Sequence, residues 1–525
     1  MHVLWLLLVI GLVLLLLGVV AVQDLVQRKH AIRRNFPVIG RFRYYLEKIG
    51  PELRQYIVAG DDEERPFSRD QRRWVYASAK QENNYFAFGT DDPIDSTPGH
   101  VLVKHSTLGC STPASSPQTG IDAALPCAKV LGASRGRRHA FRPASVVNIS
   151  GMSFGALSGA AVEALNRGAA LAGCLHNTCE GGLSPHHRHG GELVFQLGTA
   201  YFGVRDESGR FDLARLRDLV ASAPVRALEI KLSQGAKPGL GGHLPGAKVS
   251  AEIAATRGIP VGGDCISPSR HAEFSTVDGL LDFVELLADE TGLPVTLKSA
   301  VGELHFWQEL ADAMASGTRG VDGITIDGGE GGTGAAPLVF TDHVALPFRT
   351  AFPRVYGVFA ERGLPERVVW GASAKVGLPD RALLAMAMGA DLLHAAREPM
   401  LAIGCIQAKK CHTDHCPTGV ATQSAWLSRG LDPTLKSVRC ANYVKTLRRD
   451  MLKVSQAAGH EHPALLTTDD LEMLSGAGEW QSGQALTGYP ADCALPSQAD
   501  RAALVELMSP APEGGSVLPS ATSQG

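Results

Sequence analysis

Short apolar, β-branched runs alternate with helical patterns over the central part of the chain. Each run ends in glycine, serine, aspartate or lysine, as buried parallel strands do where turns follow them. Eight such runs occur, at 146–150, 173–181, 227–233, 261–267, 294–300, 323–329, 368–373 and 391–396. Eight strands joined through helices predict an α/β fold, a (β/α)8 TIM barrel. A doubly wound open sheet is the alternative.

Polar residues stand where these runs end. In a barrel of parallel strands the carboxyl ends meet at one rim, and active sites lie there. We therefore expect one shared site for the residues at these ends: Ser150, Glu180, Lys231, Asp264, Lys298, Asp327 and Ser373.

An uncharged stretch of twenty residues, 3–22, precedes this pattern. As a helix it would span about 30 Å, the thickness of the hydrocarbon core of a bilayer. Basic residues follow it directly: Arg28, Lys29, Arg33, Arg34, Arg41 and Arg43. The positive-inside rule then predicts a single-pass anchor in the inner (plasma) membrane, with the main domain in the cytoplasm. A cleavable signal peptide is the alternative, although it would have a basic start and a shorter apolar run.

The remaining patterns divide the chain further. Charged amphipathic segments such as 43–57 and 69–82 predict an N-terminal helical arm, and helical patterns after the barrel predict a C-terminal helical extension. The last residues are rich in proline, glycine and serine, and we expect them to be disordered. The expected boundaries are an anchor at 1–23, an arm or cap at 24–144, a barrel with a cysteine-rich segment at 145–428, an extension at 429–508 and a tail at 509–525.

Composition narrows the choice of function. Hydrophobic residues make up 45% and charged residues 20% of the chain, which suits a large folded core. The formal net charge of −3 argues against a nucleic-acid-binding protein, which needs a basic surface. Ten cysteines in 525 residues are too few for a disulfide scaffold.

Three of these cysteines are clustered. Cys405, Cys411 and Cys416 lie within twelve residues, and a proline follows the last of them. In a cytoplasmic setting such spacing indicates a metal site rather than disulfides, and three thiolates suit a three-iron cluster. Zinc is the main alternative, because His412 or His415 could supply a fourth ligand. Three unrelated core cysteines remain a further possibility.

Two other segments carry candidate chemistry. The glycine-rich run 327–337 follows a predicted strand and lets backbone approach a flat ring or a substrate closely. Its G-x-G-x-x-G match is weak as a dinucleotide motif, and a purely structural glycine turn is the alternative. In the run 231–246, Lys237 could bind a substrate carboxylate with help from Gln234 and Arg257. The alternative, which the sequence supports equally well, is that Lys237 is a solvent-exposed lysine in a loop.

Taken together, these segments resemble the FMN-binding domain of glutamate synthases. The resemblance covers roughly 146–423 and is carried by four motifs in the same order: NISGMSFGALS (148–158), EIKLSQGAKPG (229–239), GGEGGTGAAP (328–337) and GCIQAKKCHTDHCPTGVATQ (404–423). With its apolar N-terminus and its arm, the whole chain is similar to the membrane-anchored, single-subunit glutamate synthase-related proteins.

The resemblance implies two cofactors and a reaction. FMN would lie at the strand ends, with a [3Fe-4S] cluster beside it on Cys405, Cys411 and Cys416. Electrons would pass through the cluster to the flavin, which reduces 2-iminoglutarate, formed from 2-oxoglutarate and ammonia, to glutamate.

The resemblance also assigns residues to roles. It places Gln234, Lys237 and Arg257 at the substrate carboxylates and matches Glu180 to the acidic residue of the family's N-x-G-E-G-G segment. Flavin contacts fall on Met152, Ser153, Lys298, Gly329, Gly331, Gly332 and Gly371. A cation such as Lys298 near the flavin pyrimidine would stabilise the anionic reduced form.

The chain also departs from the family pattern. Leu240 and His243 stand where the family usually has Glu and Gln, HAAREPM (394–400) replaces a glycine-rich phosphate loop, and Cys179 replaces a glycine. We find no segment resembling a glutamine-hydrolysing or a nicotinamide-binding domain. The expected partners are therefore a 2-oxo acid or amino acid, an electron-donor protein (a ferredoxin or a reductase subunit) and a separate glutaminase subunit. There are two alternatives. The substrate could be a different 2-oxo acid, amino acid or amine, or the protein could be a non-catalytic electron relay at the membrane.

Overall fold

A computed structural model describes residues 2–57, 62–85, 88–110, 125–489 and 493–508. The expected disordered tail, 509–525, lies outside these residues. At the centre is a closed barrel of eight parallel strands. In chain order they are β2 (Val147–Ile149), β3 (His176–Asn177), β4 (Leu193–Leu197), β5 (Val225–Lys231), β8 (Val295–Ser299), β9 (Gly323–Asp327), β10 (Val369–Ser373) and β11 (Leu392–Ala395). The predicted TIM barrel is confirmed, and the closed order excludes the open sheet.

The barrel strands read as continuous apolar runs because both of their faces are covered. All residues of β4, β9 and β10 are buried, by helices outside and by side chains inside. The register brings the strand-end residues side by side: Ser373 pairs with Asp327, and Lys231 pairs with Lys298. The carboxyl rim therefore carries the polar residues that follow the strands.

One predicted strand is wrong, and one real strand was missed. The run 261–267 is not part of the barrel. Only Cys265–Ile266 (β7) is extended there, and it pairs antiparallel with His243–Leu244 (β6) outside the barrel. Asp264 is accordingly no strand-end residue of the barrel. The eighth strand is β4, whose apolar run between glycines was passed over because a short apolar run does not reveal whether it will be buried.

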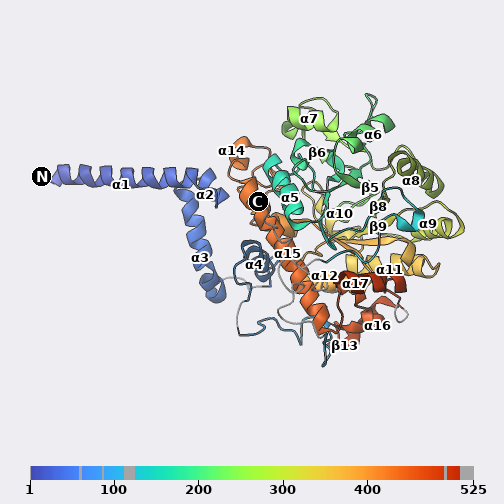
Figure 1. Cartoon of the computed structure of the whole chain (residues 1–525). Helices are drawn as coiled ribbons and strands as arrows, with labels where there is room; N and C mark the ends of the chain where they lie inside the picture. Colours follow the sequence, from blue (N-terminus) through green and yellow to red (C-terminus); the bar gives the residue numbers. More distant parts are fainter. Residues whose placement is uncertain (1, 58–61, 86–87, 111–124, 490–492, 509–525) are drawn as a thin grey trace, which may run out of the picture.

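Helices surround the barrel (Figure 1). Those between the strands are α5 (Gly159–Ala172), α6 (Leu213–Ala221), α7 (Ala251–Arg257), α8 (Val277–Thr291), α9 (His305–Ser316), α10 (Leu338–His343), α11 (Phe348–Ala360) and α12 (Pro379–Ala387). After the last strand come α13 (Arg397–Ile403), α14 (Ala425–Ser428) and the long α15 (Pro433–Ala457). The long helix α15 packs closely on α5, where a side chain at Gly168 would collide with Cys440 at 2.6 Å.

The N-terminal arm is helical, as predicted. After α1 (His2–Val26), which covers the expected anchor, its helices are α2 (Ala31–Asn35), α3 (Ile39–Ile57) and α4 (Arg69–Lys80). Helix α1 extends away from the body and is the one described helix long and apolar enough, by length and composition, to cross a membrane (Figure 1). Helix α4 lies against α13 and α15, so the arm covers one side of the barrel.

The C-terminal extension contains strands in addition to its helices. Besides α16 (Gly483–Thr487) and α17 (Gln498–Met508), it carries β12 (Leu471–Leu474) and β13 (Trp480–Ser482). These two strands form an antiparallel sheet with β1 (Val101–Val103), which belongs to the arm. The arm and the extension are therefore joined by shared strands, a long-range pairing that no local sequence pattern revealed.

Candidate active site

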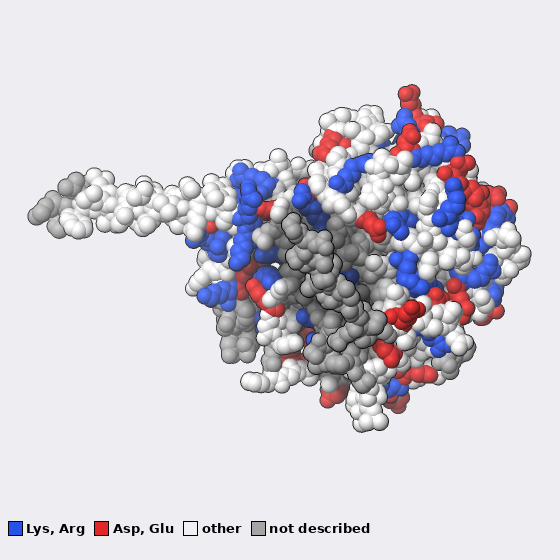
Figure 2. Space-filling model, in the orientation of Figure 1, with Lys and Arg blue, Asp and Glu red and all other residues white. Residues whose placement is uncertain are grey.

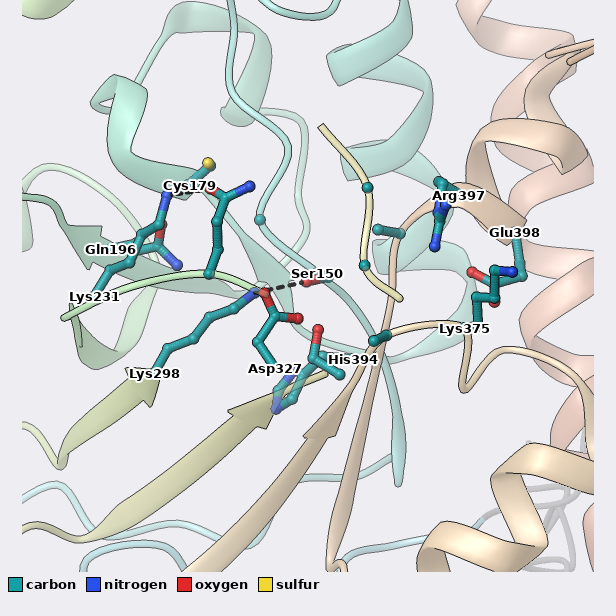
Figure 3. Close-up of a pocket in the computed structure, with 17 residues that line it drawn as sticks. Ser150, Cys179, Gln196, Lys231, Lys298, Asp327, Lys375, His394, Arg397 and Glu398 are labelled. Carbon is teal, nitrogen blue, oxygen red and sulfur yellow. Dashed lines mark hydrogen bonds and ion pairs between the residues drawn. The ribbon is translucent and has the colours of Figure 1, made fainter. Parts of the chain in front are cut away.

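A pocket opens at the carboxyl ends of the barrel strands (Figure 3). The cavity itself is narrow, with a volume of about 50 Å³, and it opens to solvent on one side. The residues labelled in Figure 3 are polar or charged and come from the ends of different strands: Ser150, Cys179, Gln196, Lys231, Lys298, Asp327, Lys375, His394, Arg397 and Glu398. Convergence of polar groups at this rim is typical of a TIM-barrel active site.

One end of the pocket is cationic. Lys375 follows β10 and Arg397 follows β11, the seventh and eighth strands of the barrel. Among the described residues, no carboxylate lies within 4.0 Å of the charged nitrogens of either side chain. Burial, together with the nearby Arg397, lowers the pKa of Lys375 to about 8. Two neighbouring cations without a paired carboxylate form a site that suits an anion.

The glycine-rich loop after β9 forms another wall. Gly331 and Gly332 line the pocket, and a Cβ at Gly332 would come within 2.8 Å of Arg397 Cδ. Asp327 Oδ2 accepts a hydrogen bond of 2.9 Å from the Gly235 backbone N–H, which connects this loop to the loop after β5. The absence of side chains therefore allows the close approach of backbone that the sequence predicted.

Lys298 lines the pocket and reaches toward Ser150. Its Nζ is 3.5 Å from Ser150 Oγ and 3.9 Å from Asp327 Oδ2, and its side chain is almost completely buried (Figure 3). The ammonium group is thus held by one weak hydrogen bond and one long ion pair. Such a cation remains available to an anionic group bound above it.

A second recess adjoins this pocket and shares Lys231 and Gln234 with it. Glu180 lies in the recess, with its Oε1 2.9 Å from Lys231 Nζ and 3.7 Å from Lys237 Nζ. Burial by itself would raise the pKa of Glu180, but the ammonium groups of Lys231 and Lys237 outweigh it and lower this pKa to about 2. The structure therefore brings three of the predicted catalytic residues together, namely Glu180, Gln234 and Lys237.

Lys237 is the less firmly held of the two lysines. Lys231 Nζ also donates to Gln234 Oε1 at 2.7 Å, whereas Lys237 Nζ is 3.5 Å from its remaining partner, Gly241 O. Burial lowers the pKa of Lys237, and Glu180 offsets this only in part. For Lys231, burial is outweighed by Glu180, and the pKa is raised. Lys237 is thus the cation that gains most from an additional carboxylate.

Arg257 does not join this group. Its guanidinium is buried, and it donates to Phe154 O in the loop after β2 at 3.1 Å and to Cys265 Sγ in β7 at 3.3 Å. It also lies over the ring of Phe202, at 5.2 Å from the centroid. It lines neither recess, although its charge helps to lower the pKa of Glu180, and its assignment to a substrate carboxylate stays a prediction.

The predicted flavin contacts divide in the same way. Lys298, Gly331 and Gly332 line the pocket, whereas Met152, Ser153, Gly329 and Gly371 do not. A side chain at Gly371, inside the barrel, would approach Thr325 Oγ1 to 2.5 Å and His394 Nε2 to 3.0 Å. Of the two departures in the substrate loop, Leu240 lines the second recess, whereas His243 is exposed and pairs with Asp264 at 3.2 Å.

The sequence-based interpretation missed several pocket residues. Lys375 and Arg397 were not assigned to the cofactor, and Gln196 and His394 were not singled out at all. Gln196 belongs to the missed strand β4 and donates to the buried Glu229 at 2.6 Å. Lys375 and Arg397 could have been predicted as site residues, because each comes just after a predicted strand. Lys298 had been selected because it stands near the end of a predicted strand.

The three clustered cysteines share one loop between α13 and α14. Cys416 is buried, Cys405 and Cys411 are half-buried, and all three are free thiols. Burial, together with the neighbouring Cys411 and Cys416, raises the pKa of Cys405 to about 12. Within the described ranges, no three histidine, cysteine, aspartate or glutamate side chains are placed to hold a metal ion. His412 and His415 are exposed, and His415 lies within 2.7 Å of Thr413 O.

Comparison with known proteins identifies the family. The family described as "Conserved region in glutamate synthase" matches residues 133–461, which is more than half of the chain. The chain belongs to the glutamate synthase family. Its barrel, both recesses and the cysteine loop all fall within the matched range, and as a member of this family it is an oxidoreductase of the glutamate synthase type.

Relatives differ in how much of their length is shared. The glutamate synthase large subunit-like protein YerD of Bacillus subtilis (strain 168) is 37% identical over 495 residues, 87% of this chain and 94% of that protein. The archaeal glutamate synthase (NADPH) of Methanocaldococcus jannaschii is 36% identical over 317 residues, 60% of this chain and 59% of that protein. The chain thus spans about three fifths of the archaeal enzyme.

Among solved structures, a mandelate oxidase mutant with the monooxide FMN adduct gives a TM-score of 0.41 at 16% identity, covering 84% of this chain and 100% of that one. A flavocytochrome b2 with sulfite bound gives a TM-score of 0.43 at 13% identity, covering 94% and 98%. Similarity at this level carries no conclusion about what the present chain binds.

Proposed function

We propose that this protein is an FMN- and iron–sulfur-dependent oxidoreductase that reductively aminates 2-oxoglutarate, through 2-iminoglutarate, to glutamate. The nitrogen would come from ammonia in solution or from a partner subunit. The observation that carries the proposal is the pair of adjoining recesses, one with an anion site and one with a lysine–glutamate cluster, joined through Lys231 and Gln234.

The first recess suits FMN in its charges and in its glycine-rich wall. Lys375 and Arg397 lie where TIM barrels commonly bind phosphate, in the loops after the seventh and eighth strands, and would hold the phosphate. The glycines of the loop after β9 allow backbone to approach a flat ring closely, and Lys298 lines the same pocket. When bound, FMN would supply the two electrons of the reduction. Lys298 would stabilise negative charge on the ring because it is buried and only weakly paired.

The second recess fits a dicarboxylate. Lys237 is buried and, among the described residues, makes only long contacts, with Glu180 Oε1 at 3.7 Å and Gly241 O at 3.5 Å, so it would bind a substrate carboxylate. Lys231 keeps Gln234 in position, and Gln234 would supply a further hydrogen bond at the boundary of the two recesses. Glu180 is held ionised by its lysines and could accept a proton only after substrate has separated it from them. These residues orient the substrate's reacting carbon toward the first recess.

The cysteine loop fits an iron–sulfur cluster in the chemistry of its donors. Three thiols of a single buried or half-buried loop are the ligand set that iron–sulfur clusters use. The exposed His412 and His415 weaken the zinc alternative. Since the thiols are not placed to share a metal ion, assembly of the cluster would require the loop to close around it. Gln407, Lys409 and Asp414 all have positive φ, so the backbone of this loop turns sharply.

Membrane attachment through residues 3–22 is part of the proposal, with the barrel on the cytoplasmic side of the inner (plasma) membrane. The exposed apolar surface of α1 and the basic residues after it support this orientation. The partners would be an electron-donor protein, either a ferredoxin or a reductase subunit, and a separate glutaminase subunit.

Leu240 favours a second candidate function. This side chain is 38% exposed and lines the recess where the family usually has a glutamate. An apolar wall would suit a 2-oxo acid or amine with a less polar side chain than 2-oxoglutarate.

The test uses the purified full-length protein. Its absorbance should show flavin bands with a broad iron–sulfur shoulder, and chemically reduced protein should be reoxidised by 2-oxoglutarate with ammonium, yielding glutamate. Ammonia-free glutamine should give no glutamate. Reoxidation by other 2-oxo acids only would favour the second candidate, and a protein without flavin would overturn both and leave an electron relay without this cofactor as the remaining function.

A further inference from the structure

Helix α3 carries an apolar surface that no other described part of the chain covers. Ile39 is 80% exposed, Phe42 62%, Tyr45 59% and Leu46 41%. At about 100° per residue, Ile39, Phe42 and Leu46 form one stripe along the helix. A soluble protein rarely leaves such a stripe in contact with water, so this surface has a partner.

The opposite side of α3 faces the body of the protein. Gly40 approaches the backbone of α2 so closely that a Cβ there would be 2.8 Å from Ile32 O, and the Tyr44 ring packs against the His30 ring in a tilted arrangement, with centroids 4.5 Å apart. Helix α2 is in turn attached to the barrel, because Asn35 Nδ2 donates to Leu427 O at 2.7 Å. Since Gly40 and Tyr44 face α2, the apolar stripe faces away from the barrel.

The direction of α3 is fixed relative to α1. Asp24, at the end of α1, accepts hydrogen bonds from the Val38 backbone N–H at 3.0 Å and from Arg41 Nε at 2.9 Å. Asp24 is fully buried in this contact. Figure 1 shows α3 running crosswise to α1 at the point where α1 meets the body. A helix crosswise to a spanning helix lies along the membrane surface, and this contact places its start at the depth where α1 ends.

The charges around α3 complement an anionic leaflet. Figure 2 shows lysine and arginine gathered where the uncharged α1 joins the body. In the sequence, α2 and α3 carry the basic residues Arg33, Arg34, Arg41, Arg43 and Lys48. An amphipathic helix with an apolar stripe and flanking basic residues is the usual form of a helix embedded at a membrane interface.

We propose that α3 is an interfacial helix, with Ile39, Phe42 and Leu46 inserted among the lipids of an anionic cytoplasmic leaflet. It would hold the barrel in one orientation on the membrane, which a single flexible anchor would not do. The cysteine loop would then be held close to the membrane surface, because Asn35 also reaches Pro417 O at 3.4 Å. This inference rests on the proposed anchoring through α1.

The test replaces single residues of the full-length protein with the photoreactive amino acid p-benzoylphenylalanine, in nanodiscs of phosphatidylcholine and phosphatidylglycerol. Position 42 is the test position, position 47 is the matched control on another side of the same helix, and position 14 in α1 controls for the anchor. After irradiation, intact mass should show several-fold more lipid adduct at position 42 than at position 47, and abundant adduct at position 14.

Each other outcome has a defined meaning. Equal or no lipid adduct at positions 42 and 47, with adduct at position 14, would overturn the interfacial helix and leave the anchor standing. Cross-linking from position 42 to a second copy of the chain would assign the stripe to self-association and also overturn it. Absence of adduct at position 14 would overturn the anchor and this inference with it.

Discussion

Gln407 and Phe67 bind one another through two hydrogen bonds. Gln407 Oε1 accepts from the Phe67 backbone N–H at 2.9 Å, and Gln407 Nε2 donates to Phe67 O at 3.0 Å. The ring of Phe67 lies beneath both cations of the pocket, 5.6 Å from Lys375 Nζ and 5.3 Å from Arg397 Cζ. One residue of the N-terminal arm therefore connects the cysteine loop to the proposed phosphate site.

Gln407→Ala should weaken this connection. It leaves two backbone groups of Phe67 without partners, and each buried unpaired group costs about 1–3 kcal/mol. We expect a lower Tm and faster loss of bound flavin on dilution, measured by the fluorescence of released FMN. Gln423→Ala, which removes hydrogen bonds to Gly155 O and Leu157 O away from Phe67, is the control and should lower Tm without selectively releasing flavin. Equal flavin loss in both variants would contradict the connection.

Lys375 should make flavin binding depend on pH. Its pKa of about 8 lies below the ordinary value of lysine, so the charge is present at lower pH and is lost as the pH rises through about 8. The phosphate of FMN is already a dianion there, since its second pKa is about 6. We expect the affinity of the apoprotein for FMN to fall between about pH 7 and pH 9, as followed by quenching of FMN fluorescence.

Lys375→Gln should weaken FMN binding near pH 7 by roughly ten- to a hundredfold and should flatten this pH dependence, because a charged hydrogen bond is lost. Lys104→Gln, an exposed lysine outside the pocket, is the control and should leave both unchanged. A Lys375→Gln protein that retains the pH dependence of the native protein would place the titrating group elsewhere.

Lys237 and Arg257 should behave differently when each is replaced by methionine. Lys237→Met should raise KM for the 2-oxo acid by about ten- to a hundredfold with little change in Tm, because it removes a charged contact from the second recess. Arg257→Met should lower Tm, because its bonds to Phe154 O and its place over Phe202 are lost. A raised KM with unchanged Tm in Arg257→Met would show that the guanidinium reaches the substrate after all.

Serine at Cys405, Cys411 or Cys416 should remove the iron–sulfur signal, since each thiolate is one of only three protein ligands in the proposed site. Iron content and low-temperature electron spin resonance are the measurements. Cys110→Ser, a half-buried cysteine outside the loop, should retain iron. Iron that survives in all three variants, or zinc present in equal amount in the native protein, would show the assignment to be wrong.

Gly371→Ala should destabilise the barrel from inside. The new methyl group would press on Thr325 and His394, and overpacking of a core typically costs about 1–3 kcal/mol. The free energy of unfolding in urea measures this cost. Gly357→Ala, at a helical position with open space around it, should be neutral or stabilising. If the Gly371→Ala protein is as stable as the native protein but does not bind FMN, Gly371 contacts the cofactor as the sequence predicted.

The fold class could be predicted because it follows from a local property. Parallel strands buried on both faces must be apolar throughout, and such runs can be counted along a chain. The count came to eight although one member was wrong. The run at 261–267 has the same local character as a barrel strand, but its Ile266 is 68% exposed in the structure. Local apolarity does not determine burial. Only the closed barrel therefore shows that β4 is a barrel strand and that the run at 261–267 is not.

The candidate site shows the same division. The sequence by itself determined the chemical types and the order of Lys231, Lys237, Lys298 and the cysteine loop, because each stands in a contiguous motif next to a strand. Only the tertiary structure brought Lys375 and Arg397 to the same pocket, and buried Arg257 against Phe154 O and Cys265 Sγ. Such convergence depends on which strands become neighbours and on the direction in which each side chain packs. Both are determined by contacts between segments that are distant in the sequence.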